Sequence, residues 1–405
     1  MHFELSDRVP VRMRLWSLGE DVLVEVGPGG DHLIAITQWG EVRIDDASSW
    51  VRESLQRLSF GPVWVENLPV QREGLRRVLE RLGNCLVQSL GLDDETGPLL
   101  SVLPVSRQAK FWRPPEVEVD RPIRLSRFVG MRASHGELVL DSPVSRYRVA
   151  LHRPLASWVV GSLCATTTIA DLAGVLRMPR PVLADIVSYL VAGGMVVAGE
   201  RGTPPQFAED ADPALIPWAQ HDLLFHARSR LGRHNGPPDP SFPQLDRLPA
   251  APVSRTPPVG SRFPLYRPPL ATLATADRPL TEVIETSRSH RDYADREVTA
   301  EHLGELLFRA ARIRWTRLVT AALGTSYVIS DRPYPSTADL YELELYLTLD
   351  RCAGLPRGSY HYDPREHVLT LISDSEPELT DLLDSAKIAA GSTRRPPVLI
   401  TVTSR

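Results

Sequence analysis

The sequence has few cysteines, almost no lysine and no long apolar run. Its three cysteines, Cys85, Cys164 and Cys352, are too far apart for a metal-binding spacing and too few for a disulfide framework. Lysine occurs only at Lys110 and Lys387, so anionic ligands would be met mainly by arginine. No stretch approaches the roughly 20 apolar residues that span a bilayer, and the N-terminus lacks a signal-peptide pattern. These absences predict a cytoplasmic protein with free thiols, without a metal site and without membrane contact.

Several catalytic motifs are also absent. The chain contains no GxSxG, GxxxxGK[ST], HExxH or CxxC, which leaves serine hydrolase, P-loop and zinc-peptidase functions without support. A formal net charge of −4 gives no overall attraction to nucleic acid. The apolar fraction of 42% and the charged fraction of 24% are those of a soluble globular protein. The length of 405 residues exceeds one hydrophobic core and predicts several domains.

The first hundred residues alternate between short apolar strands and amphipathic helices. Glycine and aspartate turns such as GPGGD separate the strands, as in a small antiparallel sheet. Ser48 is a candidate N-cap for the first helix, on which Trp50, Leu55 and Leu58 can share a face. The predicted strands cover residues 11–18, 22–26, 33–37, 41–44 and 85–90, and the predicted helices cover residues 49–58 and 71–82.

The same order of elements returns in the second hundred residues, in pattern rather than in identity. Pro154 and Pro181 stand where proline is tolerated, in the first turn of a helix. We therefore predict two tandem winged-helix modules, residues 1–100 and residues 101–200. In the second module the predicted strands cover residues 123–128, 137–141, 146–151 and 195–198, and the predicted helices cover residues 154–164, 169–176 and 181–191.

Three functions are open for these modules. A DNA-recognition helix needs basic and amide side chains, but the last helix offers only Arg180, Asp185 and Ser188. A small sheet with an open edge could instead accept an extended peptide by strand addition. A purely structural spacer is the third possibility. The pattern favours peptide binding over nucleic-acid binding.

Residues 201–279 are predicted to be a proline-rich linker. The stretch 203–280 holds 16 of the 36 prolines, which excludes a continuous helix or a central strand. One island, WAQHDLLFHARSR at 218–230, is apolar-periodic and predicted to be helical. Residues 280–405 have the pattern of an α+β domain. Its predicted helices cover residues 280–287, 300–311 and 378–390, and its predicted strands cover residues 341–350, 367–372 and 398–403.

Two segments of this last domain could hold a phosphorylated planar ligand. Arg288 and Arg291, with Ser289 between them, could bind a phosphate, although a solvated basic helix end would look the same. Downstream, RPYPST forms an extended, turning backbone whose polar groups could bond to the edge of a ring. His361 and His367 belong to a predicted hairpin and are interpreted as surface histidines.

These segments, in this order, resemble SagB-type dehydrogenases of the nitroreductase superfamily. The resemblance rests on HDLLFHARSR at 221–230, SRSHRDY at 287–293 and RPYPSTADLYELELY at 332–346, and it spans about residues 215–405. Residues 11–200 resemble, more loosely, the PqqD-like modules that recognise leader peptides. The expected fold is therefore α+β: tandem winged-helix or PqqD-like modules followed by a partial nitroreductase-like domain.

The resemblance implies an FMN-dependent oxidase that converts thiazolines or oxazolines of a ribosomally made peptide to azoles. It identifies no catalytic residue, because the family's Lys/Tyr pair would lie beyond residue 405. The residues that it implies for FMN are Arg288, Ser289 and Arg291 at the phosphate, and Pro335, Ser336 and Thr337 along the isoalloxazine ring.

The implied nitroreductase-like domain, residues 280–405, is thus expected to be its N-terminal part. The chain is then a piece of an oxidase, one half of a split enzyme, or a protein that kept peptide binding and lost redox chemistry. The alternative function is a non-catalytic adaptor that presents a leader peptide to other enzymes. The expected partners are the precursor peptide, through leader and core, and either a second copy of the chain or other peptide-modifying enzymes.

Overall fold

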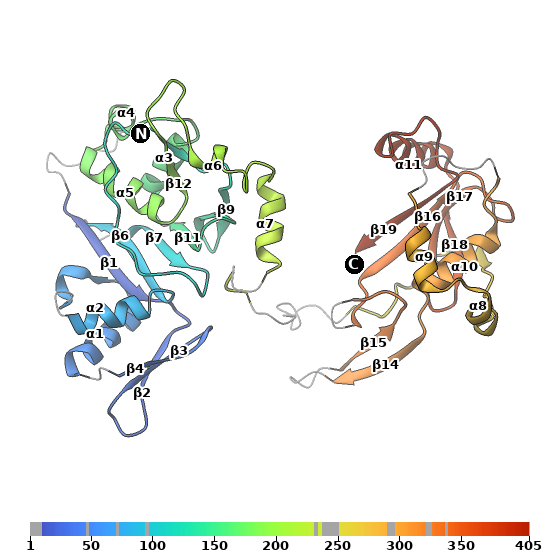
Figure 1. Ribbon diagram of the computed structural model, residues 1–405, viewed down its shortest axis with the longest axis horizontal. Coiled ribbons are helices and arrows are strands. Elements are labelled where there is room, and N and C mark those ends of the chain that lie inside the picture. The colour runs from blue at the N-terminus through green and yellow to red at the C-terminus, as the bar shows by residue number, and fades with distance from the viewer. Residues whose placement is uncertain are drawn as a thin grey trace. The chain divides into compact units, whose positions relative to one another are not determined.

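The protein is a mixed α/β structure with several antiparallel sheets (Figure 1). The coordinates are a computed structural model. Contacts divide the chain into two units, residues 1–238 and residues 239–405, which are described separately. No helix among the described residues is both long and apolar enough to cross a membrane. The structure describes residues 10–45, 48–69, 73–93, 97–230, 234–236, 251–289, 296–320, 326–336 and 339–404.

A seven-stranded antiparallel sheet runs through the whole first unit. Its order is β5-β1-β6-β7-β11-β10-β9. The central strand β7 pairs with β6 on one side and with β11 on the other, so the two predicted modules share one sheet. The position between residues 100 and 101 lies inside β7. The strands are β1 (Arg12–Leu18), β5 (Val63–Trp64), β6 (Leu86–Leu92), β7 (Pro98–Pro104), β9 (Gly130–Ser134), β10 (Glu137–Asp141) and β11 (Tyr147–Leu151).

A smaller sheet and two helices complete the N-terminal half of this unit. The turn between β2 and β3 places Gly29 and Gly30 at φ of 96° and 76°, a conformation that glycine adopts without strain. Ser48 stands at the predicted N-cap of α1, but its side chain makes no capping hydrogen bond to the first turn. The elements are β2 (Leu23–Val26), β3 (Leu33–Thr37), β4 (Gly40–Ile44), α1 (Ser49–Phe60), the short 3-10 helix η1 (Val65–Asn67) and α2 (Glu73–Arg81).

Three helices cover one face of the large sheet and form its main core. Leu183, Ile186 and Leu190 of α5 are fully buried in the cluster that also contains the apolar side chains of β7 and β11. Thr168 caps α4 by accepting a hydrogen bond from the N–H of Asp171 at 3.1 Å. The elements are α3 (Pro154–Ser162), α4 (Ile169–Leu176), α5 (Arg180–Ala192) and a small pair of strands, β8 (Ile123–Leu125) and β12 (Val196–Ala198).

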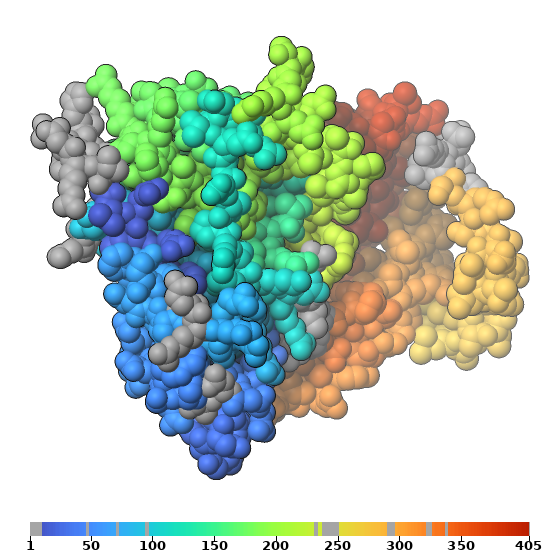
Figure 2. Space-filling model, turned by 60° about the vertical axis from the view of Figure 1, so that its left-hand side comes forward, coloured from blue at the N-terminus to red at the C-terminus, as the bar shows by residue number. Residues whose placement is uncertain are grey.

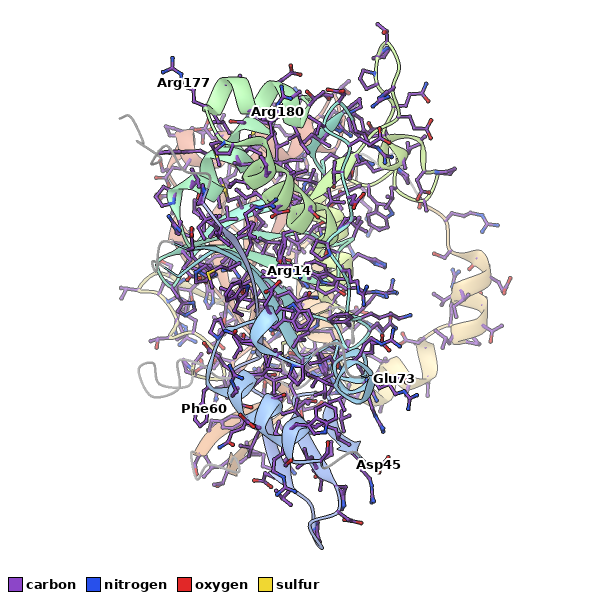
Figure 3. The ribbon with its side chains drawn as sticks, turned by 90° about the vertical axis from the view of Figure 1, so that its left-hand side faces the viewer. Arg14, Asp45, Phe60, Glu73, Arg177 and Arg180 are labelled. Atoms are coloured by element: carbon purple, nitrogen blue, oxygen red, sulfur yellow. The ribbon has the colours of Figure 1, made fainter. Side chains whose placement is uncertain are left out.

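The polar residues of α5 that could read DNA are mostly engaged elsewhere. Asp185 forms an ion pair with Arg12 at 3.3 Å, and partial burial raises the pKa of its carboxyl. The hydroxyl of Ser188 is largely buried and donates to the carbonyl of Pro115 at 2.6 Å. Arg180 remains exposed and lies beside Arg177 at one end of the unit (Figure 3).

A buried carboxylate fastens the proline-rich stretch to the first unit. Glu209 of α6 (Ala208–Ala211) is 7% exposed and accepts hydrogen bonds from the Arg124 guanidinium at 2.9 Å, the Ser126 hydroxyl at 2.6 Å and the Arg127 N–H at 3.0 Å. The Arg127 guanidinium in turn donates to two carbonyls just before α7 (Gln220–Arg228). Residues 206–228, expected within a linker, are therefore part of this unit, and in Figure 2 they join its continuous surface.

The second unit contains a five-stranded antiparallel sheet in the order β13-β18-β17-β16-β19. Leu303 and Leu307 of α10 pack against Leu347 and Tyr360 of the sheet. The side chain of Thr299 accepts from the N–H of His302 and begins α10 in a capping box. The elements are β13 (Arg262–Pro264), α10 (Ala300–Ala311), β16 (Leu343–Leu349), β17 (Gly358–Asp363), β18 (Val368–Ser373), α11 (Glu376–Ala389) and β19 (Val398–Ser404).

Two parts of the second unit differ from the sequence expectations. The predicted linker contributes both β13 and α8 (Leu270–Ala276). A two-stranded ribbon, β14 (Trp315–Thr320) and β15 (Ser326–Asp331), was not predicted. Helices α8 and α9 (Leu280–Thr286) have no buried residue.

The three cysteines are free thiols, as the sequence predicts. Cys85 and Cys352 are buried, whereas Cys164 is exposed. Burial raises the pKa of the Cys85 thiol to about 11, which keeps it protonated and unreactive near neutral pH.

Replacing Glu209 tests whether its buried carboxylate fastens residues 206–228. Glu209→Gln removes the charge that three donors share, so we expect the first unit to lose about 2–3 kcal/mol of unfolding free energy. Asp210→Asn is the matched control, because Asp210 contacts the same Arg124 guanidinium but is half-exposed, and its loss should cost below about 1 kcal/mol. Urea unfolding followed by tryptophan fluorescence measures both; equal losses would contradict the assignment.

Candidate functional site

The turn after β15 is built around a buried arginine. Arg332 is 3% exposed, and its guanidinium donates to the carbonyl of Val253 at 2.8 Å and to the hydroxyl of Tyr334 at 3.3 Å. The Tyr341 ring lies 5.3 Å from the guanidinium carbon and meets Tyr334 edge-on. Among the described residues no carboxylate pairs with Arg332, so dipoles and a ring face alone offset its charge. The turn therefore favours a neighbouring negative charge.

Ser336 closes this turn with its hydroxyl. It accepts the N–H of Tyr341 at 3.0 Å and donates to the carboxylate of Glu342 at 3.3 Å. Asp339 and Tyr341 adopt φ of 55° and 47°, a left-handed conformation that is costly for a tyrosine. The buried Tyr341 ring and the Ser336 hydroxyl hold this strained conformation.

Arg288 and Ser289, predicted at the FMN phosphate, follow α9 and are exposed. The Arg288 guanidinium donates to the carbonyls of Ser287 at 2.9 Å and Glu285 at 3.5 Å, at the C-terminal end of α9. In the described part of the chain it has no carboxylate partner. Its charge is therefore available to an anion.

Of the other residues predicted to bind FMN, two lie within the described ranges and two do not. Pro335 is exposed and Ser336 is half-buried, whereas Arg291 and Thr337 lie outside the described residues. Within the described ranges, no hydrogen bond, ion pair or ring contact joins Arg288 or Ser289 to the turn. The contacts of Arg288 and those of Ser336 are each local, and they do not connect the two segments.

Behind the turn lies a buried acid–histidine pair that the sequence did not single out. Glu344 and His361 are 3% and 1% exposed, and their side chains meet at 3.0 Å. Nδ1 of His361 and the hydroxyl of its cross-strand neighbour Thr370 are buried without hydrogen-bond partners. Strand alternation could have found this pair, because it puts Glu344 opposite the apolar face of Leu345 and Leu347.

The second histidine of the hairpin, His367, is structural. It is 2% exposed; its Nε2–H donates to the carbonyl of Tyr266 at 2.9 Å, and its Nδ1 accepts from the Tyr362 hydroxyl at 2.8 Å. Burial, with the nearby charges of Arg267 and Arg312, lowers the pKa of His367. The interpretation of both hairpin histidines as surface residues was wrong: His361 meets Glu344 of the neighbouring strand, and His367 packs against Phe308 of α10.

The lowered pKa of His367 predicts acid sensitivity. The stabilisation from neutral His367 is present above its ordinary pKa of 6.5 and is lost as the pH falls below that value, because the unfolded chain then binds the proton more readily. We expect the unfolding free energy of the second unit to decrease from about pH 7 to about pH 5. His367→Gln should flatten this dependence, whereas His221→Gln, at a fully exposed position, should leave it unchanged. Parallel pH dependences in all three proteins, measured by urea unfolding, would rule this out.

The first unit contains a Glu–His–Ser array with hydrogen-bond distances typical of a catalytic triad. Nδ1 of His152 lies 2.6 Å from Glu137, and its Nε2 lies 2.8 Å from the Ser101 hydroxyl. However, Ser101 is in mid-strand, shares a 2.6 Å hydrogen bond with Ser89 and is 6% exposed. The ladders to β6 and β11 use the neighbouring backbone N–H groups, so no pair of donors is free to stabilise an oxyanion. We interpret the array as a cross-strand polar network.

Comparison with known proteins adds one family to these observations. Residues 123–235 match the family model of the cyanobactin oxidase ThcOx. The matched segment runs from β8 past α7 and includes the buried Glu209 and its three donors. It thus coincides with a structurally continuous part of the first unit and does not extend to the turn at Arg332. No curated protein matches the chain. The described residues contain no cluster of metal-ligating side chains.

Proposed function

We propose that this chain acts as an FMN-dependent oxidase of the SagB type in ribosomal peptide biosynthesis, converting thiazoline or oxazoline rings of a precursor peptide to azoles. The match of residues 123–235 to the cyanobactin oxidase model is the observation that carries the proposal, because it supports an oxidase role in that kind of pathway. The order of the motifs around Arg288 and Arg332 supports the flavin, and the second unit is then a nitroreductase-like domain.

The residues present suit a flavin in their chemistry. Arg288 carries an exposed charge without a carboxylate partner, as a phosphate ligand requires. With Ser289 and Arg291 it would hold the FMN phosphate, while Pro335, Ser336 and Thr337 would lie along the ring. The bound flavin would accept the hydride released by the azoline. Arg332 would add a buried positive charge to this turn.

Partner contacts are a further part of the proposal. Helix α9 exposes Leu280, Val283 and Ile284, with 75%, 47% and 63% of their surface accessible. Apolar side chains gathered on a helix without a buried face are typical of an interface. We propose that a second copy or another peptide-modifying enzyme covers α9.

Flavin binding tests the oxidase function. The purified chain, supplied with FMN and its partner enzymes, should show flavin absorbance and oxidise an azoline peptide. Arg288→Gln should weaken FMN about tenfold or more, because it removes charge-assisted hydrogen bonds to the phosphate, and should affect riboflavin little. Arg278→Gln is the control, since this exposed arginine of the same region pairs only with Glu282. A protein that remains colourless under all these conditions is not a flavoenzyme.

A specific observation also favours the adaptor function. β9 is the edge of the seven-stranded sheet, and its hairpin to β10 has a two-residue turn, His135-Gly136, with positive φ at both positions. Such a turn makes Ser134 and Glu137 a hydrogen-bonded pair, so the N–H groups of Met131 and Ala133 face outward. An extended leader peptide could pair with them.

A proline in β9 tests whether a leader peptide binds there by strand addition. Ala133→Pro removes an outward donor and leaves the internal ladder intact, so leader-peptide binding should weaken about tenfold. Ala133→Ser retains the N–H and should bind like the unchanged protein. Fluorescence anisotropy with a labelled leader peptide measures all three. Binding that is the same in the proline and serine variants would exclude β9 as the docking edge.

A further inference from the structure

A pocket of about 300 Å³ in the second unit is lined by an unusual number of arginines. It lies between the end of α10 and the turn that joins β17 to β18. Phe308, Leu270, Ile313 and Pro364 supply its apolar walls. Its charged residues are Arg267, Arg312, Arg314 and Arg365, and none of them belongs to the predicted flavin site.

Most of this positive charge has no counter-charge. Arg314 is paired with Asp331 at 2.6 Å, and the neighbouring Glu366 is paired with Arg262. Among the described residues, Arg267 donates only to the carbonyl of Glu366, and Arg312 only to the carbonyl of Phe308 at 2.5 Å.

The turn contains one further acid, Asp363, and the pocket one further arginine, Arg365. Asp363 uses its carboxylate to accept the N–H groups of residues 365 and 366. Arg365 has no side-chain partner within the described residues. Three guanidinium charges around this pocket are therefore left without a carboxylate.

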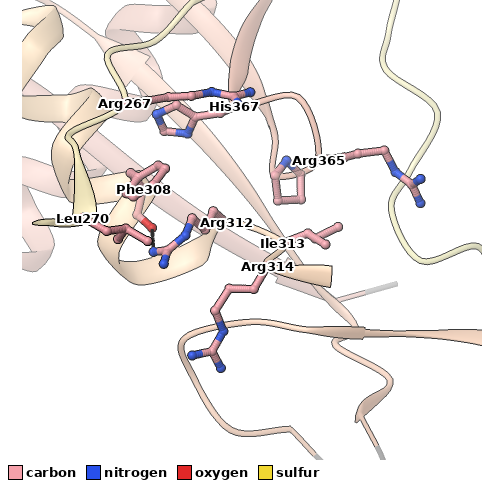
Figure 4. A pocket seen from close by; sticks show the side chains of 9 residues that line it. Arg267, Leu270, Phe308, Arg312, Ile313, Arg314, Arg365 and His367 are labelled. Carbon is pink, nitrogen blue, oxygen red and sulfur yellow. Dashed lines mark hydrogen bonds between the residues drawn. The ribbon is translucent and has the colours of Figure 1, made fainter. Parts of the chain in front are cut away.

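The positive charges of Arg267 and Arg312 affect the pKa values of the same two buried residues, His367 and Tyr362. Both lower the pKa of His367, and both oppose the rise that burial causes in the pKa of Tyr362. Figure 4 shows Arg267 beside His367 and the Arg312 guanidinium beside Phe308, whereas Arg365 extends outward. The Arg312 guanidinium lies over the Phe308 ring, 4.1 Å from its centre, which fixes its plane. The pocket thus has two guanidinium groups, of Arg267 and Arg312, beside its interior residues, and a third, of Arg365, that extends outward.

We propose that this pocket binds a phosphate group. A phosphate carries about −1.5 to −2 charges at neutral pH and so offsets the two inner guanidinium groups, whereas a carboxylate offsets only one. Guanidinium forks match phosphate oxygens in geometry. The apolar walls leave room for the organic part of a small phosphate monoester. None of the lining residues is a proposed flavin ligand, although Arg314 also donates to the carbonyl of Arg332 in the turn at 2.8 Å.

Calorimetric titration of the full chain without flavin tests this proposal. Inorganic phosphate and phenyl phosphate are titrated at equal ionic strength, with sodium chloride as the blank. The unchanged protein should bind saturably, and Arg267→Gln should weaken binding about tenfold. Arg267 is exposed and contacts only a carbonyl, so this variant should fold. Arg312→Gln should weaken binding similarly. Arg317→Gln is the control, because Arg317 carries the same charge on β14 and does not line the pocket.

These measurements distinguish an organic phosphate ligand from free phosphate, and they can also exclude phosphate binding at this pocket. Tighter binding of phenyl phosphate than of inorganic phosphate identifies an organic monoester, and equal binding identifies free phosphate. If neither ligand binds saturably, or if Arg317→Gln weakens binding as much as Arg267→Gln does, the pocket is not a phosphate site. Should Arg312→Gln unfold, Arg267→Gln still decides the question.

Discussion

The first unit depends on the buried Glu209 carboxylate. Its three donors come from residues 124–127, while Glu209 itself belongs to the proline-rich stretch, so one side chain joins two segments that are more than 80 residues apart. Without its donors a buried carboxylate would be costly, and with them it holds α6 against residues 124–127. Both sides of this contact, residues 124–127 and Glu209, lie within the segment that matches the cyanobactin oxidase model.

The second unit has a different constraint: several of its arginine side chains have no carboxylate partner among the described residues. Arg332 is buried at the turn, Arg288 is exposed beyond α9, and Arg267 and Arg312 lie at the basic pocket. Nearly all cationic side chains of this chain are arginines, which keep their charge even when buried. Unpaired guanidinium groups at separate places are consistent with more than one anionic group being bound by this unit.

Much of the fold could be predicted from local periodicity. The helices over 169–176 and 300–311 and the strands over 33–37 and 137–141 have the predicted bounds, because each is specified by its own apolar spacing and caps. The β14–β15 ribbon was missed because most of its side chains are exposed and carry no such signal. The sequence indicated the turn at RPYPST, but it did not indicate the buried Glu344–His361 pair.

The sequence by itself determined most of the helices and strands, the free thiols and the two motifs that resemble a flavin oxidase. Only the tertiary structure decided that both N-terminal halves share one sheet, that the proline-rich stretch belongs to both units, and that His361 and His367 are buried. The physical reason is that strand pairing and the burial of polar groups depend on residues distant in sequence. Local patterns specify an element and its apolar face, but not the partner that covers it.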